Sequence, residues 1–508
     1  MNLVPRSLVA TLAATALTVP LLLGAAPAHD QARDAARDAA RLSRELVRDA
    51  SAESAYRHLE RFQAVADASG GNRAAGSAGH EASARYVHDQ LEEAGYDVAY
   101  EPFDFTYVET LAEKLTVRAP ERREIAITAM SYTKSTPEGG ITAAVAAVPV
   151  DATTGCEPAD YASGSVTGKI ALIERGGCDF AVKQRSAAAA GAVGAVIYNN
   201  ADGALSGSLG SAKDAPAPTA GIPTGGITRK DGTALAAAVR KAEAGGAAEA
   251  VRVTMDVRQL REQRTTRNVI AETRGGDPAR TVMLGAHLDS VGKGPGINDN
   301  GSGSAGLLEV ALRLAATHER PDNKVRFAWW SAEELGLLGS EAYVKARTPA
   351  ERSAVALYLN FDMIASPNFA QLVYDGDDSD REGAGPGPAG SAQLERGIND
   401  FLDSHGIAHK GADFDGRSDY GPFVAAGIPS GGTFTGAEVV KTRGDAERFG
   451  GEAGVAYDAC YHLACDDLSN INMTAFDNNI DVIADAVGRY AHDLGPLTAG
   501  PSSAPQRP

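Results

Sequence analysis

The sequence predicts an α/β protein in which helices cover both faces of a mixed, mostly parallel sheet. Three apolar segments beyond Arg267, at residues 281–286, 325–330 and 355–361, have the pattern of buried strands. A helix pattern at residues 303–316 separates the first two of these segments. Strands that alternate with helices are typical of parallel sheets whose faces are covered.

A change of composition divides the chain, whose 508 residues are about three times the length of a typical domain. Between residues 118 and 255, Ala, Gly and Val dominate, and short strand patterns alternate with Gly-rich turns. This region therefore reads as an inserted, β-rich α/β domain. The division that we expect is an export signal at 1–28, the first part of the main domain at 29–117, the insertion at 118–255, the rest of the main domain at 256–495, and a disordered Pro/Ser-rich tail at 496–508.

The charge balance excludes two classes of partner. Lys and Arg number 48 against 66 Asp and Glu, so the formal net charge is −18. Nucleic acids and anionic membranes need positive surface, and we expect neither as a partner. Hydrophobic residues at 44% and charged residues at 22% are ordinary for a soluble globular protein and exclude disorder over the whole chain. A monomer is the working expectation.

The first 28 residues have the pattern of a secretory signal peptide. Arg6 provides a basic start, an apolar run covers residues 8–23, and Ala-Pro-Ala at 26–28 forms a cleavage site of small residues. A membrane anchor is the alternative, but a proline and a glycine interrupt the run and no basic cluster follows it. We therefore expect a secreted protein. Residues 29 to about 50 remain open as a propeptide or as part of the mature fold.

Export determines how the four cysteines are interpreted, because thiols outside the cytoplasm are expected to form disulfides. Pairing of neighbours, Cys156 with Cys178 and Cys460 with Cys465, is the simplest of the three possible connectivities. A cysteine–metal site is the alternative, but neither pair has the spacing that zinc clusters favour.

Side chains able to bind metal follow each predicted strand of the main domain. In open α/β sheets, ligands bind beyond the carboxyl ends of the strands. Each residue alone also has a structural interpretation; Asp299, for example, could simply cap its helix. Their joint placement favours two metal ions sharing a bridging carboxylate, since zinc takes imidazole nitrogen and carboxylate oxygen as ligands. The candidate ligands are His287, Asp299, Glu334, Asp362 and His462.

With these residues in place, the chain resembles a secreted M28-family zinc aminopeptidase of the Leu-preferring actinobacterial type. Residues 72–96 resemble the N-terminal helix of that family, and residues 168–200 resemble a protease-associated (PA) domain, which is non-catalytic and lies beside or over the active site in related peptidases. The motifs that carry the resemblance are GAHLDS (285–290), GINDNGSG (296–303), WWSAEELGLLGS (329–340), LNFDMI (359–364), FDGRSDYGPF (414–423) and CYHLACDD (460–467).

The resemblance implies the zinc-exopeptidase (phosphorylase/hydrolase-like) fold and two Zn²⁺ ions per chain. The enzyme would release N-terminal, large apolar residues such as Leu from peptides or proteins. The implied roles are His287 and Asp362 on one zinc, Glu334 and His462 on the other, Asp299 as the bridge, Glu333 as general base, Asp289 as the residue that orients His287, Tyr461 as donor to the oxyanion, and Arg417 in the substrate pocket.

Three other functions use a similar fold. A carboxypeptidase would need cationic groups for the substrate carboxylate, and Arg417 is the obvious nearby candidate. A glutaminyl cyclase uses a single zinc, and a metal-free binding protein lacks the ligands; the full ligand set argues against both. A Ca²⁺ site at Asp477, Asp481 and Asp485 is a further possibility, with a solvated helix face as the alternative.

Overall fold

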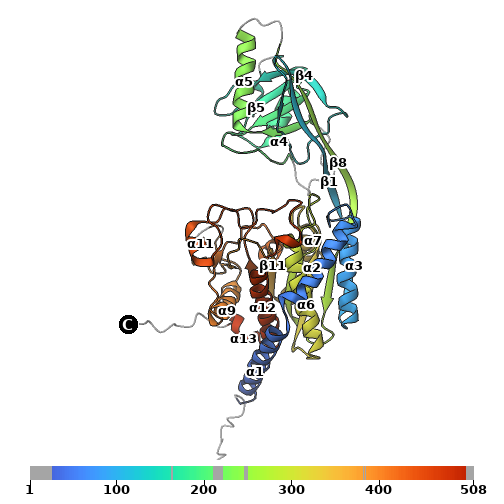
Figure 1. Ribbon diagram of the computed structural model, residues 1–508, viewed down its shortest axis with the longest axis vertical. Helices are drawn as coiled ribbons and strands as arrows, with labels where there is room; N and C mark the ends of the chain where they lie inside the picture. Colours follow the sequence, from blue (N-terminus) through green and yellow to red (C-terminus); the bar gives the residue numbers. More distant parts are fainter. Residues whose placement is uncertain are drawn as a thin grey trace, which may run out of the picture.

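The computed structural model describes residues 26–161, 164–209, 221–244, 250–381, 383 and 385–498, which form two domains joined by a long antiparallel ribbon (Figure 1). The predicted signal peptide lies outside the described residues except for its last three, which begin helix α1 (Ala26–Asp49). The predicted tail lies outside them from residue 499 onward, and its first residues belong to the short helix α13 (Gly495–Thr498). Among the described helices, none combines the length and apolarity needed to cross a bilayer.

The main domain is built on a mixed, mostly parallel sheet, which confirms the predicted fold class. Its strand order is β13-β12-β14-β11-β9-β10-β8, with β9, β10, β11 and β14 parallel to one another. The three predicted strands lie within β9, β10 and β11. The strand bounds are β9 (Asp277–His287), β10 (Asn323–Trp330), β11 (Val355–Asp362), β12 (Leu372–Tyr374), β13 (Lys410–Ala412) and β14 (Ser430–Phe434).

Helices cover both faces of this sheet because alternate strand residues point to opposite sides. Trp329 and Trp330 of β10 show this directly, since both are fully buried but belong to different apolar clusters. The Trp329 cluster includes α2 (Ala52–Asp67), α3 (Ala78–Glu93), α6 (Gly303–Ala316), α9 (Ser391–Ser404) and α12 (Met473–Tyr490). The Trp330 cluster includes α7 (Leu338–Ala346) and α10 (Tyr420–Ala425).

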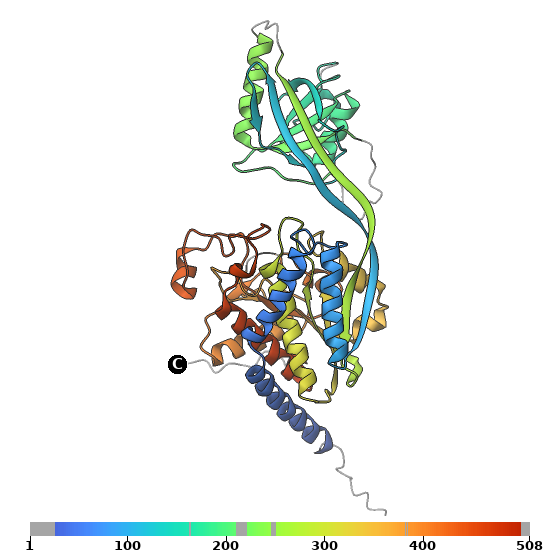
Figure 2. The ribbon, with the colours of Figure 1, turned by 45° about the vertical axis from the view of Figure 1, so that its right-hand side comes forward.

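Helix α1 packs its C-terminal half against α12, while its N-terminal half projects from the domain (Figure 2). Leu42 and Leu46 are fully buried in the main core. The two helices approach so closely that a Cβ on Gly488 would lie 2.3 Å from the Cα of Ser43. Residues 42–46 are thus part of the packed main domain in this structure.

The ribbon consists of β1 (Asp97–Ala119) and β8 (Arg252–Glu272), paired from Asp97 opposite Glu272 to Ala119 opposite Arg252. Figure 2 shows it rising from the main sheet and entering the second domain. At its base β8 pairs with β10, and at its top it pairs with β4 (Ile141–Ala147). Both predicted ends of the insertion, at residues 118 and 255, therefore fall within continuous strands.

The inserted domain continues the sheet through β4, β5, β6 and β7, which are parallel to one another. It has its own apolar clusters on both faces of these strands. Its elements are β2 (Arg123–Ile125), β3 (Thr128–Ala129), β5 (Ile170–Glu174), α4 (Phe180–Ala189), β6 (Gly194–Tyr198), β7 (Thr224–Ile227) and α5 (Arg229–Ala244).

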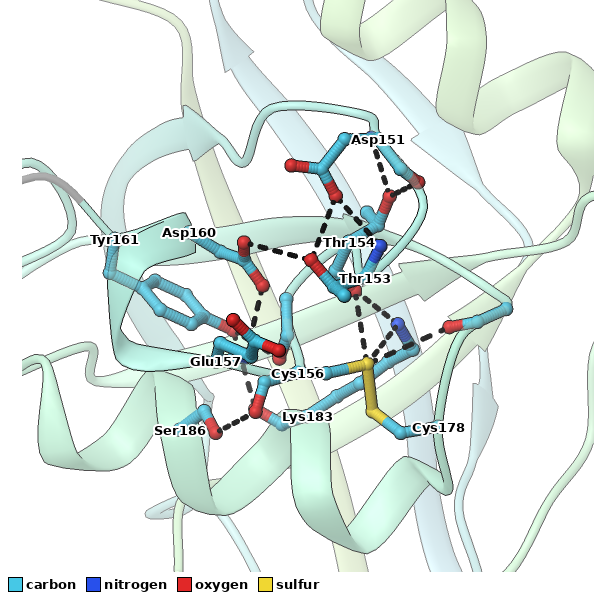
Figure 3. Close-up of a disulfide and its surroundings, with 12 residues drawn as sticks. Asp151, Thr153, Thr154, Cys156, Glu157, Asp160, Tyr161, Cys178, Lys183 and Ser186 are labelled. Carbon is cyan, nitrogen blue, oxygen red and sulfur yellow. Dashed lines mark hydrogen bonds between the residues drawn. A yellow bond between two sulfur atoms is a disulfide. The ribbon is translucent and has the colours of Figure 1, made fainter.

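Both disulfides predicted from local pairing are present, Cys156–Cys178 in the insertion and Cys460–Cys465 in the main domain. Figure 3 shows the first of them beside the buried Lys183. The Lys183 ammonium donates to the backbone carbonyl of Thr154 and lies 3.8 Å from the Cys156 sulfur. The disulfide and this lysine together fix the loop between β4 and β5.

Candidate metal centre

The carboxyl ends of β9, β10 and β11 deliver the predicted site residues to one place. His287 is the last residue of β9, and Asp362 is the last residue of β11. Glu333 and Glu334 follow the end of β10 after two residues. Asp299 lies in the turn η3 (Ile297–Ser302) that leads into α6. The parallel arrangement of the three strands brings these side chains together, as the sequence pattern predicts.

These residues and His462 form two neighbouring groups of potential metal ligands. One consists of His287, Glu333 and Asp362, and the other of Asp299, Glu334 and His462. The carboxylate of Asp299 faces both groups, with Oδ1 at 3.2 Å from His287 Nε2 and Oδ2 at 3.1 Å from His462 Nε2. The His287 nitrogen lies 3.3 Å from Asp362 Oδ1, and the His462 nitrogen lies 2.9 Å from Glu334 Oε2.

The hydrogen-bond pattern fits a bound cation. His287 Nε2, Glu334 Oε1 and Asp362 Oδ1 are buried and have no hydrogen-bond partner among the described residues. Buried polar atoms are normally paired, and an unpaired one costs about 1–3 kcal/mol. Atoms of this kind that converge from three strand ends form a donor set of imidazole and carboxylate, the set that zinc prefers.

The electrostatics of the site point the same way. Burial raises the pKa of Glu334, and the nearby Asp299 raises it further, to about 8. Burial lowers the pKa of His462, but Asp299 and Glu334 outweigh this effect and raise it to about 10. Burial also raises the pKa of Glu333 well above its usual range. Such shifts are what crowded, desolvated carboxylates produce, and a divalent cation would compensate their charge.

Asp289 contacts His287 mainly through its backbone. The carbonyl oxygen of Asp289 accepts from His287 Nδ1 at 3.1 Å, whereas the Asp289 carboxylate lies 3.7 Å from the same nitrogen. That carboxylate instead accepts from the backbone N–H of Glu333 at 3.2 Å. Asp289 therefore connects the His287 strand end to the Glu333 segment.

Three residues that support the site were not singled out from the sequence. The Ser418 hydroxyl donates to Asp362 Oδ2 at 2.6 Å. The buried Asp466 carboxylate accepts the backbone N–H groups of Asn298 at 2.8 Å and of Asp299 at 3.0 Å. Ser418 lies in the motif at 414–423, and Asp466 lies in the motif at 460–467. Their place in these motifs is the sequence feature that could have pointed to them. The third residue, Arg73, lies in the motif at 72–96.

Arg73 is fully buried and fixes the loop between β9 and Asp299. Its guanidinium donates to the backbone carbonyls of Leu288, Pro295 and Gly296. Burial lowers its pKa to about 10, although Asp289 and other nearby carboxylates favour the charged form. The buried Arg73 guanidinium therefore fixes this loop through its backbone carbonyls and lies close enough to the carboxylates of the site to interact with their charge.

Tyr461 and Arg417 both lie at a pocket next to the two ligand groups. The pocket has a volume of about 190 Å³, and its lining includes Met363, Tyr374, Tyr420 and Phe434. Arg417 donates to the Tyr461 hydroxyl at 3.2 Å and forms an ion pair with Glu438 at 3.1 Å. The pocket thus combines apolar and aromatic side chains with charged ones next to the candidate metal centre.

Two of the three acidic residues suggested for calcium have other partners. Asp477 accepts from the backbone N–H of Ala52, and Asp485 binds Ser43 and Arg489. Among the described residues, the groups of acidic or histidine side chains close enough to share an ion do not include Asp477, Asp481 and Asp485.

Comparison with known proteins places this arrangement in a family. The family model described as "Peptidase family M28" matches residues 268–487, and the "PA domain" model matches residues 141–235. The chain is 45% identical over 441 residues to leucine aminopeptidase 2 of Arthroderma otae, covering 87% of this chain and 82% of that protein. It is 42% identical over 447 residues to an aminopeptidase of Pseudomonas aeruginosa, covering 86% of this chain and 80% of that protein.

Solved structures agree with these matches. The aminopeptidase from Aneurinibacillus sp. strain AM-1 aligns with a TM-score of 0.66 at 28% identity, over 88% of this chain and 95% of its own. BSAP, a zinc aminopeptidase from Bacillus subtilis, aligns with a TM-score of 0.60 at 26% identity, over 86% of this chain and 94% of its own. The chain therefore belongs to peptidase family M28, as a metallo-aminopeptidase with an inserted PA domain.

Proposed function

We propose that the chain is a secreted dizinc aminopeptidase that removes large apolar residues, Leu above all, from the N-termini of peptides. The observation that carries this proposal is the position of the Asp299 carboxylate. One of its oxygens lies beside His287 and the other beside His462, and the residue lines a partly apolar pocket. The disulfides and the pattern of the first 28 residues support secretion.

In this proposal five side chains hold two zinc ions. His287 and Asp362 would hold one ion, Glu334 and His462 would hold the other, and Asp299 would contribute to both. Zinc ions in such a site polarise a carbonyl oxygen and lower the pKa of water to about 7. The unpaired atoms of His287, Glu334 and Asp362 support this assignment, because each lacks a hydrogen bond in the described structure.

Glu333 is the proposed general base. Its backbone is fixed by Asp289, and its carboxylate lies at the surface of the pocket, with Oε2 at 3.9 Å from His287 Nε2. From this position it can take a proton from the attacking water and return that proton to the leaving amine. The Tyr461 hydroxyl accepts a hydrogen bond from Arg417 and so keeps its own proton free to donate to the oxyanion.

The charge of the pocket favours an aminopeptidase over a carboxypeptidase. Apart from the proposed zinc ligands and the proposed base, its lining includes two carboxylates, Asp413 and Asp415. Its single arginine, Arg417, already forms an ion pair with Glu438. A pocket of this sign attracts the ammonium of a free N-terminus and repels the carboxylate of a free C-terminus.

The test compares Leu-p-nitroanilide with its N-acetylated form, before and after treatment with a zinc chelator. We expect cleavage of the free-amine substrate alone, loss of cleavage on chelation, and recovery when zinc is returned. Elemental analysis of the active protein is expected to give two zinc ions per chain. Cleavage of N-blocked dipeptides in place of the anilide would instead establish a carboxypeptidase.

A further inference from the structure

A second pocket, with a volume of about 400 Å³, reaches the same centre from another direction. It is lined by Asp289, Glu334 and His462, by the ribbon residues Tyr107–Thr110 and by Lys293. The pocket of 190 Å³ is built from residues of β11, β12 and β14 and the loops near them. The two pockets thus take their walls largely from different parts of the sheet, and they share His462 of the candidate metal centre.

The ribbon wall of the second pocket is held against the Glu333–Glu334 segment. Phe105 of β1 packs in an apolar cluster with Ala75 and Ala332, and Tyr107 and Leu335 pack against this cluster. On the other ribbon strand, Asn268 accepts from the backbone N–H of Ser331 at 3.0 Å. These contacts place the base of the ribbon at a fixed position beside the catalytic carboxylates.

The second pocket has about twice the volume of the first. Its outer part carries charged side chains of both signs, Glu109 on the ribbon and Lys293 on the loop after β9, and both are solvent-exposed. Across the pocket, Asn72 closes the loop by donating to the Gly292 carbonyl at 3.3 Å. A pocket of this size suits a length of peptide chain, whereas the smaller one, whose lining includes Tyr374, Tyr420 and Phe434, suits one apolar side chain.

We propose that the second pocket binds the second and third residues of the peptide substrate, and that the ribbon carrying the inserted domain forms its outer wall. A peptide whose first side chain occupies the smaller pocket would then extend from the centre toward Tyr107 and Lys293. The insertion therefore contributes to substrate selection through its connecting strand. This inference rests on the proposed aminopeptidase activity.

The test measures how charge in the pocket changes the choice of the second residue. The substrates are Leu-Glu-Gly and Leu-Lys-Gly, and the readout is the ratio of their kcat/KM values. We expect Lys293→Glu to lower the Glu/Lys ratio about fivefold and Glu109→Lys to raise it about fivefold, because exposed charges interact modestly across a pocket. Both changes in the ratio are expected to shrink as salt is raised from about 0.01 M to 0.15 M.

Arg280→Glu serves as the charge-matched control, since Arg280 is exposed and lies near the amino-terminal end of β9, away from the site. It changes net charge as Lys293→Glu does, and its Glu/Lys ratio is expected to equal that of the wild type. Equal ratios in Lys293→Glu, Glu109→Lys and wild type would overturn the inference while Leu-p-nitroanilide cleavage still supports the proposed function. Absence of anilide cleavage by the wild type would instead overturn the proposed function itself.

Discussion

The two domains differ in the hydrogen bonding of the polar side chains at their strand ends. In the insertion, the Tyr198 hydroxyl donates to Glu174 at 2.9 Å, and Arg175 donates to Asn199 at 3.2 Å. At the matching edge of the main sheet, three ligand atoms are buried without a hydrogen bond among the described residues. They belong to His287, Glu334 and Asp362.

This difference separates a strand end that stabilises a fold from one that binds a ligand. A buried polar atom without a partner destabilises the native state, so a fold retains several of them together where something outside the chain supplies the partner. Both domains contain a set of parallel strands packed against helices, and this shared architecture does not by itself distinguish them. The pairing of the polar atoms at their strand ends distinguishes them.

The largest effect is expected from Glu333→Gln, which removes the proposed base but keeps the side-chain volume. We expect kcat on Leu-p-nitroanilide to fall by about 10²–10⁴, the usual contribution of general acid–base catalysis. Zinc content by elemental analysis is expected to stay at the wild-type level. Glu447→Gln, an exposed change on α11 (Arg443–Phe449), is the matched control. A Glu333→Gln enzyme nearly as fast as wild type would show that the base is another group.

A substitution that creates a cavity in the core of the insertion is expected to lower the stability of that domain without changing the rate of peptide cleavage. Ile197 is fully buried in β6, and Ile197→Ala is expected to cost about 2–5 kcal/mol of unfolding free energy in that domain. Cleavage of Leu-p-nitroanilide at 25 °C is expected to stay within twofold of the wild type. Leu284→Ala, in β9 of the main core, is the comparison, and it is expected to lower stability and zinc retention together. Denaturant unfolding and zinc analysis distinguish the two outcomes.

Asp466→Asn tests the support beneath the shared ligand. Asp466 accepts two backbone N–H groups in the turn that carries Asp299, and Asn470 donates to its carboxylate at 3.0 Å. The amide can replace only one of these acceptor oxygens, and we expect zinc affinity to fall about 10–100-fold, as is typical when a partner of a metal ligand is changed. Asp467→Asn, one residue later, is expected to leave the affinity unchanged. Equal zinc dissociation constants for the two variants would contradict a positioning role for Asp466.

Much of the candidate site could be predicted from the sequence because each ligand follows a recognisable strand or motif. His287, Glu334 and Asp362 lie near the ends of three parallel strands, and strand ends in such sheets meet at one edge. The structure also confirms the predicted fold class and the two disulfides. The roles assigned to the individual ligands remain proposals.

The supporting contacts could not be predicted, because they join residues far apart in sequence through backbone atoms. Arg73 binds carbonyl groups more than 200 positions away, and Asp466 binds N–H groups more than 160 positions away. A pattern of side chains carries no information about which backbone groups will meet them. The ends of the inserted domain are also hard to predict from composition. The composition changes near residues 118 and 255, but β1 and β8 run through these positions as continuous strands.

The smallest effect concerns Asp445, a buried carboxylate that has all its partners, in contrast with Glu334. Although burial raises the pKa of Asp445, hydrogen bonds from Lys410, Tyr457 and Thr442 outweigh it and lower that pKa to about 2. A carboxyl whose pKa is lower in the folded state stabilises the fold above its unfolded pKa and loses that contribution as pH falls through the folded value. The contribution is thus complete above about pH 4 and disappears toward pH 2.

Asp445→Asn removes this titration, and we expect it to lower the unfolding free energy by about 1–2 kcal/mol at pH 5. The difference from wild type is expected to shrink as the pH falls toward 2, and urea denaturation of both proteins between pH 2.5 and 5 measures it. Loss of zinc at low pH affects both proteins alike and cancels in the difference. A difference independent of pH would show that the Asp445 partners stabilise its neutral form equally. The contrast between satisfied and unsatisfied carboxylates would then rest on the metal centre alone.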